Sequence, residues 1–444
     1  MIALALLCAA ASAGGGARSA ASFVPTAADG ALLLEGAQGA AGLRAFLEGV
    51  AQRAPALAAG PRLAASVGPD LLSQPLSWGL ASAGARAVVL LSGSAGLTAP
   101  VRDARAARSA LQSWLAEYGT THTVRGPPVR GLLVAGEGRR MRAGVVASVA
   151  GGSRLLTASG PRAMALVGML AHAGARTGGA PLSADRALAA GLAQLTGSAA
   201  LILRGADPLR AAALSLDGSA RGLIARGLVL APAPLLSGAA PGASACVGAS
   251  LLCLRAGLGP AGREALALAA RAYLSALFGP TTRDGADRLA QGAAAVAERV
   301  VVRSDGADPR LLSSEREALW ALRLQAVTEP PGSEGAADAQ GPRSFCIRAD
   351  AAAAWFGTPC PAAAPADPRA AGETSALEAQ LDLAAADAVL QKLTPLDALH
   401  GGLAAALYAG RLTVGGLLRA SGPVTVTGRP HPAGAEVELR WPLH

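Results

Sequence analysis

The sequence predicts an α+β fold in which two lobes of mostly antiparallel sheet are covered on one face by helices. Clusters of short apolar runs, separated by glycine-containing turns, alternate with stretches of helical periodicity in both halves of the chain. Near the C-terminus, apolar and charged residues alternate, as is typical of strands with one buried and one wet face. A chain of 444 residues is also long enough for about two or three domains, and we take two lobes as the working count.

The first thirteen residues, 1–13, are predicted to be a signal peptide. An apolar run, Ile2–Ala10, ends at Ala11-Ser12-Ala13, which fits a small-x-small cleavage site. Cys8 follows the large residue Leu7, which disfavours lipid attachment at that cysteine. We therefore expect export to the periplasm or the cell surface. The alternative is that this stretch is a buried helix or strand that opens the fold.

The N-terminal lobe is expected to span residues 23–198, and its first half alternates strands with amphipathic helices. In the first helix the apolar residues fall on one side, with a spacing of three or four residues. The predicted elements are a strand at Ala31–Glu35, a helix at Leu43–Arg53, a strand at Ala87–Leu91 and a helix from Val101 to Tyr118.

The period of the apolar pattern then changes to that of an antiparallel meander. Glu137-Gly138 and Gly151-Gly152 separate its short apolar runs, and glycine is the residue that tight turns favour. The predicted strands are Val129–Ala135, Ala143–Val149 and Arg154–Ala158. Two helices follow, one opened by Pro161 and running to His172, and one capped by Ser183 and ending near Gly197.

The C-terminal lobe is expected to span residues 199–444. It starts with the strand Ala200–Leu203 and a hairpin whose arms flank a turn at Asp217-Gly218. A strand at Ser250–Leu254 and a helix at Pro260–Phe278 follow. Two stretches rich in Pro, Gly, Ala and Asp are interpreted as exposed loops, at 329–342 and 361–373.

The last part of this lobe has the clearest strand patterns. Leu377, Ala379, Leu381 and Leu383 alternate with polar residues, and so do Val437, Leu439 and Trp441. The final strand is expected to pair with Val424–Thr427 across residues 428–434. Helical spacing between the strands predicts two helices, at Ala384–Lys392 and Leu396–Tyr408.

Four cysteines remain once Cys8 is removed with the leader. They are Cys246, Cys253, Cys346 and Cys360, an even number in a chain expected to mature under oxidising conditions. Of the three possible connectivities, we favour Cys246 with Cys253 and Cys346 with Cys360, because each closes a short loop. The spacings differ from those of zinc ribbons and no histidine lies close to either pair, so no metal site is predicted.

The net charge of +9 comes almost entirely from arginine, since Lys392 is the single lysine. Arg139, Arg140 and Arg142 form the one tight basic cluster, and we interpret it as a solvated hairpin tip rather than a binding patch. Without clustered charge and aromatic platforms, no nucleic-acid partner is predicted. No apolar run after the leader reaches the length of a transmembrane helix, so the mature chain is expected to have no span.

The order of these segments resembles exported bacterial proteins grouped as domain of unknown function 3352. The resemblance covers most of the mature chain. It is carried by the leader, the Phe23-Val24-Pro25 entry to the first strand, the run Arg154–Ser159 before a helix, Pro181–Asp185 opening the next helix, and the terminal Leu381-Asp382-Leu383 strand. It implies export and an α+β architecture, and contributes no activity and no site residue.

Common catalytic signatures are missing from the sequence. The residues before Lys392 fit neither a phosphate-binding loop nor a Ser-x-x-Lys acyl-enzyme site. No histidine begins the HExxH pair of a zinc protease. The Gly-x-Ser-x-Gly elbow of α/β-hydrolases is also missing. Gly257–Gly262 matches GxGxxG, but Pro260 removes an amide and no acidic residue ends a strand about twenty residues on, so we favour a plain strand-to-helix turn. No catalytic or metal-ligating residue and no cofactor is predicted.

The sequence therefore favours an exported, non-enzymatic protein that binds a partner protein of the cell envelope or an apolar ligand. The Leu- and Ala-rich helix over Ala163–Ala171, with Met164 and Met169, could line an apolar pocket or simply pack in the core. One alternative is an exported hydrolase with a dispersed Ser/His/Asp site built on a histidine such as His122. The segment His400-Gly401-Gly402 is similar to the glycine-bearing oxyanion loops of some lipases, but those loops precede the nucleophile and this one lies near the C-terminus. We therefore interpret it as a local irregularity in a helix. The other alternative is an envelope structural or assembly factor.

Overall fold

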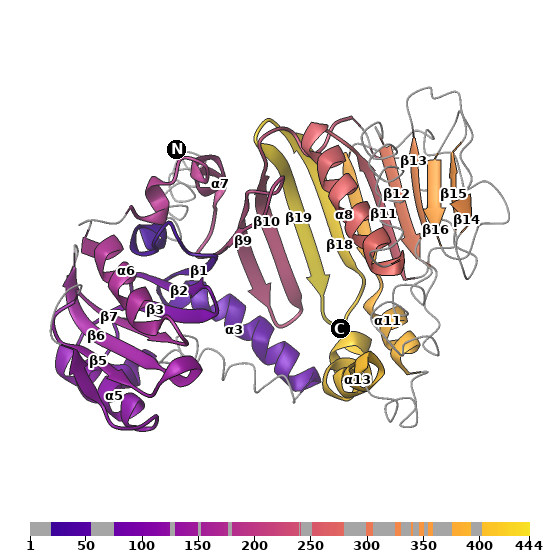
Figure 1. Cartoon of the computed structure of the whole chain (residues 1–444). Coiled ribbons are helices and arrows are strands. Elements are labelled where there is room, and N and C mark those ends of the chain that lie inside the picture. The colour runs from indigo at the N-terminus through magenta and orange to yellow at the C-terminus, as the bar shows by residue number, and fades with distance from the viewer. Residues whose placement is uncertain are drawn as a thin grey trace, which may run out of the picture. The chain divides into compact units, whose positions relative to one another are not determined.

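The fold combines helices with extensive antiparallel sheet, which confirms the predicted α+β class. The computed structural model describes residues 19–54, 75–124, 129–149, 152–175, 180–238, 240, 251–278, 299–304, 325–329, 339–340, 346–349, 354–357, 375–391 and 402–444. The chain divides into two compact units (Figure 1). The first contains residues 1–206 and 210–230, and the second contains 207–209 and 231–444.

The first unit is built on one antiparallel sheet with the strand order β4-β5-β6-β7-β3-β2-β1-β8-β9-β10. Hairpins connect most neighbours, while β1 sits centrally between β2 and β8. The strands are β1 (Gly30–Glu35), β2 (Ala85–Leu91), β3 (Ser94–Pro100), β4 (His122–Val124), β5 (Leu132–Ala135), β6 (Arg142–Val149), β7 (Gly152–Ser159), β8 (Ala199–Arg204), β9 (Ala211–Ser219) and β10 (Gly222–Leu230).

Helices cover both faces of this sheet. Leu111 of α5 belongs to a core cluster that includes Leu97 of β3, and Leu43 of α3 packs against the same cluster. On the opposite face, a Cβ at Gly96 would lie 2.8 Å from the Leu166 side chain of α6, so this glycine lets α6 approach the sheet. The helices are α3 (Gly36–Arg53), α5 (Ala104–Ala116), α6 (Ala163–Ala175) and α7 (Ala189–Gln194), with 3-10 turns η1 (Ala21–Phe23), η3 (Pro75–Trp78), η4 (Gly138–Arg140) and η5 (Leu182–Ala184).

The expectation that helices cover only one face is therefore wrong for this unit. A strand covered on one side alternates buried and exposed residues, but every residue of β7 from Arg154 to Ser159 is buried. The expected boundary at residue 198 also moves. Strand β8 pairs with β1, with Leu201 opposite Leu32, so residues 199–206 and 210–230 complete the first sheet.

The strands of the second unit are also antiparallel, and their order is β14-β15-β16-β13-β12-β11-β17-β18-β19. Its strands are β11 (Leu252–Gly257), β12 (Arg299–Ser304), β13 (Gln325–Glu329), β14 (Ala339–Gln340), β15 (Cys346–Ala349), β16 (Ala354–Gly357), β17 (Leu377–Leu381), β18 (Val424–His431) and β19 (Gly434–Pro442). The helices are α8 (Pro260–Phe278), α11 (Leu383–Leu390) and α13 (Gly402–Ala420).

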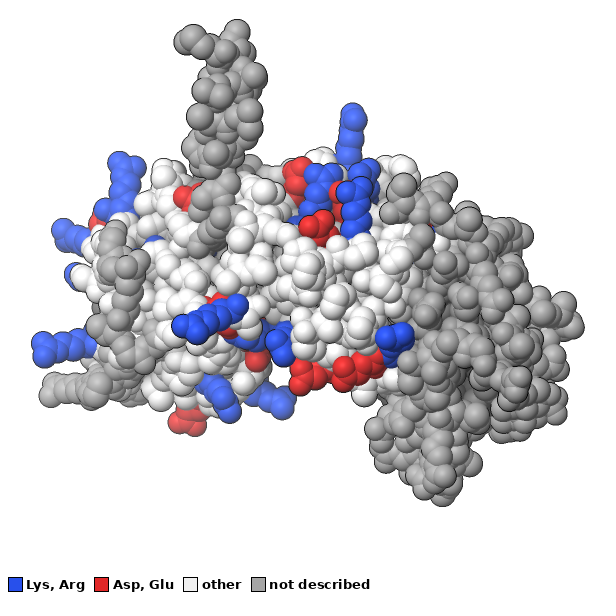
Figure 2. Space-filling model, turned by 90° about the horizontal axis from the view of Figure 1, so that it is seen from above, with Lys and Arg blue, Asp and Glu red and all other residues white. Residues whose placement is uncertain are grey.

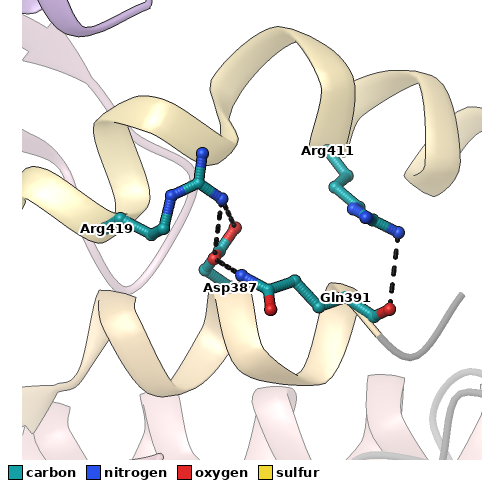
Figure 3. A network of polar contacts seen from close by, with 4 residues as sticks. All are labelled: Asp387, Gln391, Arg411 and Arg419. Atoms are coloured by element: carbon teal, nitrogen blue, oxygen red, sulfur yellow. Dashed lines mark hydrogen bonds and ion pairs between the residues drawn. The ribbon is translucent and has the colours of Figure 1, made fainter.

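Asp387 joins α11 to α13 in this unit (Figure 3). Its carboxylate is 1% exposed and accepts hydrogen bonds from Gln391 Nε2 and, at 3.2 Å, from Arg419 Nη1. Arg411 Nη1 reaches the carbonyl of Gln391 at 3.4 Å, so a second cation of α13 also contacts α11. The helices come close here, because a Cβ at Gly415 would lie 3.1 Å from Asp387 Oδ1. This network fixes the relative position of the two helices.

Several local predictions need correction. The helix expected from Ser183 to Gly197 is split, because Asp185 adopts an extended conformation after η5 and α7 begins only at Ala189. The hairpin turn lies at residues 220–221 instead of Asp217-Gly218, since Ser219 still pairs with Gly222. Leu383 belongs to α11, not to the preceding strand, because Asp382 caps that helix by accepting from the Ala385 amide at 2.9 Å.

The helix predicted to end at Tyr408 continues to Ala420 in α13. The loop expected at 329–342 contains the end of β13 and the short strand β14. The rest of that loop, the loop at 361–373 and the predicted signal peptide at 1–13 lie outside the described residues.

Candidate functional site

Strands β1, β2, β8 and β9 have one tightly buried face and one partly open face. Successive side chains of a strand point to opposite sides, and on one side residues such as Leu33, Val89 and Ile202 are fully buried. On the other side, Leu34, Ala199 and Arg86 are buried at one end, whereas the apolar side chains towards the other end are half-buried or exposed. That side is the candidate site, and we call it the open face. It consists of Gly30, Leu32, Val88, Leu90, Leu201, Leu203, Ala212 and Leu214.

The strand register places these residues in two rows. In the outer row, Gly30 pairs with Leu90 on one side and with Leu203 on the other, and Leu203 pairs with Ala212. Leu90 is 50% exposed and Leu203 is 42% exposed. A Cβ at Gly30 would lie 3.4 Å from Leu203 Cδ2 and 3.9 Å from Leu90 Cδ1, so the two leucines lean over the glycine from both sides.

The inner row extends the same apolar surface. Leu32 pairs with Val88 and with Leu201, and Leu201 pairs with Leu214. All four are half-buried, and Leu32 and Val88 also pack against the core cluster of Leu97 and Leu111, so the inner row is the edge of the core. Neither row contains a charged or hydroxyl side chain. A cluster of exposed apolar residues of this kind on a folded protein is typical of a binding surface for apolar groups.

Asp29, which precedes β1, holds the outer row in place. Its backbone N–H donates to the carbonyl of Leu90 at 2.9 Å, and its carbonyl accepts from the Arg204 N–H at 2.8 Å. Its side chain accepts from the N–H of Ser92, which has a positive φ of 46° in the turn after β2. One residue therefore fixes the ends of both strands that carry the exposed leucines.

An ion pair anchors β8 from its buried face. Arg204 Nη2 binds the carboxylate of Asp185 and donates to the Thr26 carbonyl at 2.8 Å, and the Ala187 N–H donates to Asp185 at 2.9 Å. Burial alone would raise the pKa of Asp185, but the hydrogen bond from Arg204 together with backbone hydrogen bonds lowers that pKa below its ordinary value. The charged pair thus supports the strand beneath Leu203 without contributing charge to the open face.

A second notable cluster is aromatic. The rings of Trp78 and Trp114 meet edge to face at 6.3 Å, Trp114 meets Tyr118 at 6.0 Å, and the Arg142 guanidinium lies 4.4 Å over the Tyr118 ring. Trp114 Nε1 and Arg142 Nε are buried and lack a hydrogen-bond partner. Arg142 is therefore not part of a solvated tip as expected, whereas Arg139 and Arg140 are exposed.

The GxGxxG match lies at the junction of β11 and α8, where two of its amides are already hydrogen-bonded within the protein. The Gly259 N–H donates to the Leu235 carbonyl at 3.0 Å, and the Ala261 N–H donates to the Pro234 carbonyl at 3.2 Å. A Cβ at Gly262 would lie only 2.0 Å from the Leu235 carbonyl oxygen. These glycines therefore allow a neighbouring backbone segment to approach, and that segment occupies the place where a phosphate would bind.

The other sequence candidates are spread over the fold. His122 is exposed on β4, and His400, Gly401 and Lys392 lie outside the described residues. On α6, Leu166 and Leu170 are buried while Met164 is 39% exposed, so this helix packs its leucines against the sheet. No group of three or more His, Cys, Asp or Glu residues with metal-binding geometry occurs in the described part of the chain.

Cys253, on β11, is disulfide-bonded. Cys246 and Cys360 lie outside the described residues, and Cys346 is described only through the backbone of β15. The pairing of Cys246 with Cys253 and of Cys346 with Cys360 therefore stays a prediction.

Charged side chains stand in small separate groups on the face shown in Figure 2, with wide uncharged areas between them. Among the described helices, none is both long and apolar enough to cross a membrane.

Comparison of the chain with protein-family models, with curated proteins and with solved structures finds no match. The resemblance to domain of unknown function 3352 stays a prediction.

Proposed function

We propose that the protein is an exported, non-enzymatic binding protein of the cell envelope, which holds a partner protein or an apolar ligand on the open face. The observation that carries this proposal is the outer row, where Leu90 and Leu203 are 50% and 42% exposed beside Gly30. Fully burying a leucine side chain contributes about 1.5–3 kcal/mol, so covering these two half-exposed side chains would contribute about half of that for each.

Export is part of the proposal, and two features support it. The apolar run Ile2–Ala10 before Ala11-Ser12-Ala13 has the pattern of a cleavable leader. The disulfide at Cys253 is the kind of bond that persists in oxidising compartments. We further propose that the two compact units correspond to the two lobes expected from the sequence.

Binding of a neutral apolar dye tests the binding claim. We expect Nile red to bind the full chain and the double variant Leu90→Glu, Leu203→Glu to bind it at least about tenfold more weakly, because two carboxylates would have to be desolvated. Both side chains are already exposed, so the variant should unfold within about 1 kcal/mol of the parent.

Leu412→Glu is the matched control, because Leu412 is 68% exposed on α13, outside the open face. The control should leave dye binding unchanged. Equal affinity of the double variant and the parent, or a loss caused by Leu412→Glu alone, would show that the open face is not the binding surface.

A further inference from the structure

Arg86 of β2 is a buried cation whose donors are not all used. Its residue exposure is 0%, yet Nε and Nη1 are both buried without a hydrogen-bond partner. Nη2 is the paired nitrogen, and it donates to the carbonyls of Ala81 at 2.5 Å and Ser82 at 3.2 Å. Burying a guanidinium group costs free energy unless its charge is paired and its N–H groups form hydrogen bonds. Two donor nitrogens of Arg86 do not meet this condition within the protein.

The positive charge of nearby Arg154 adds to the cost of burying the Arg86 guanidinium. Burial lowers the pKa of Arg86, and no carboxylate among the described residues offsets that effect. Arg154 is 6% exposed, and its pKa is lowered to about 10 by burial and by repulsion from Arg86, with partial compensation from Glu35. The region therefore holds two buried guanidinium groups, and among the described residues Glu35 is the carboxylate that acts on Arg154.

Arg154, in contrast to Arg86, is well supported. Its Nε donates to Thr98 Oγ1 at 2.9 Å, Nη2 donates to the Ala85 carbonyl, and the Phe23 ring stacks on the guanidinium at 3.7 Å. Arg154 thus has a complete structural role within the fold. Arg86 is left with two donor nitrogens, Nε and Nη1, that have no hydrogen-bond partner.

Arg86 lies next to a segment of the chain that reaches the surface. The two carbonyls that hold Nη2 belong to residues 81–84, the segment that leads into β2, and Ser82 and Ala83 in this segment are exposed. The guanidinium therefore lies directly below a surface segment instead of deep within the sheet.

We propose that Arg86 binds a small oxyanion, a carboxylate or a phosphate, which enters beneath the 81–84 segment and accepts hydrogen bonds from Nε and Nη1. The negative charge of the anion offsets the repulsion between Arg86 and Arg154. Guanidinium groups pair especially well with carboxylate and phosphate oxygens, which is why this class of ligand fits the unused donors. This proposal is independent of the proposed function that Nile red tests, because the anion would bind a buried cation and the dye would bind exposed leucines.

Thermal unfolding of the full chain tests this proposal. Inorganic phosphate and acetate should each raise Tm by about 2 °C or more at saturation, relative to chloride at the same ionic strength, because a ligand that binds only the folded state stabilises it. The variant Arg86→Leu should lose this dependence. In anion-free buffer it should unfold no more easily than the parent, because it removes an unmatched charge.

Arg139→Leu is the control, because Arg139 is exposed on η4 in the same unit, and it should keep the full response. A response to phosphate alone or to acetate alone would identify which source of oxyanion the site takes. Equal shifts with chloride, or an unchanged response in Arg86→Leu, would overturn the proposal.

If Arg86→Leu does not fold, phosphorus NMR of inorganic phosphate with the parent protein gives an independent result. Binding broadens the phosphate resonance, and excess acetate should compete and narrow it again. A phosphate line that is as sharp with the protein as without it would overturn the proposal.

Discussion

The ion pair of Asp185 and Arg204 illustrates how single residues set the stability of the first unit. The hydrogen bond from Arg204 keeps the pKa of Asp185 below its ordinary value of 3.8. The folded state therefore binds fewer protons than the unfolded state at acidic pH. The stability that this pair contributes is complete above pH 3.8 and is lost as the pH falls through the lowered pKa.

We predict that Asp185→Asn lowers the free energy of unfolding by about 1–3 kcal/mol at neutral pH, because Arg204 loses its charged acceptor. Urea unfolding measured from pH 7 downwards should show a shallower loss of stability in the variant than in the parent. Arg440→Gln, which removes an exposed pair with Glu438, should change stability by less than about 1 kcal/mol. Parallel pH curves for Asp185→Asn and the parent would contradict this assignment.

Single residues also limit what the sequence could reveal about the candidate site. The stretch Ala31–Glu35 was expected to be a buried strand, yet Leu32 is only half-buried. Leucine is typical of a protein core, so the sequence gives no sign that Leu90 and Leu203 are exposed. Their place on the surface depends on how their strands pair on either side of Gly30. That arrangement depends on register between segments 60 and 173 residues apart in the sequence, for which a single sequence contains no local signal.

At the scale of elements, the contact between α11 and α13 depends on an asymmetric ion pair. The side chain of Asp387 is 1% exposed, whereas that of Arg419 is 59% exposed. Loss of the carboxylate leaves Arg419 free to be solvated. Loss of the guanidinium leaves a buried carboxylate with Gln391 as its remaining side-chain donor among the described residues.

We predict that Arg419→Gln destabilises the protein by more than Asp387→Asn does, with a difference of about 1–2 kcal/mol, because an unpaired buried charge costs more than an unpaired exposed one. Chemical unfolding followed by circular dichroism measures both variants. Leu412→Ala on the exposed side of α13 should unfold like the parent. A larger loss in Asp387→Asn than in Arg419→Gln would be incompatible with this account of the helix pair.

The elements that the sequence predicted well share strong local signals. Helix α5 begins where Asp103 caps it, accepting from the Arg105 N–H at 2.9 Å, and β6 and β7 are apolar runs that pair as far as Val149 and Gly152. Strand β3 was missed because Ser94–Pro100 is rich in small residues and ends in proline. Its conformation depends on pairing with β2 and β7, which is tertiary information.

At the scale of the whole molecule, the lobe boundary was misplaced for a related reason. The hairpin of β9 and β10 follows β8 in the sequence, and the apolar pattern indicated the start of a new cycle there. The pairing of β8 with β1 instead returns the chain to the first sheet. Which sheet a strand joins is decided by long-range partners, and local periodicity does not encode that choice.

The cysteine framework yields a prediction for the whole mature chain. Peptide mapping of the native protein without reduction should find Cys246 joined to Cys253 and Cys346 joined to Cys360, because each bond closes a short loop. Reduction of these bonds should lower Tm, since the unfolded chain then gains conformational freedom. A peptide that joins Cys246 to Cys346 or to Cys360 would contradict the proposed layout of the second lobe.

Photochemical footprinting with a carbene-generating reagent, read by mass spectrometry, tests the proposed binding surface most directly. The full chain would be labelled with and without a saturating apolar ligand such as Nile red. We predict that labelling falls at Leu90 and Leu203 when the ligand is present and is unchanged at Leu412. Unchanged labelling at both leucines, or protection confined to Leu412, would contradict the assignment of the open face as the binding surface.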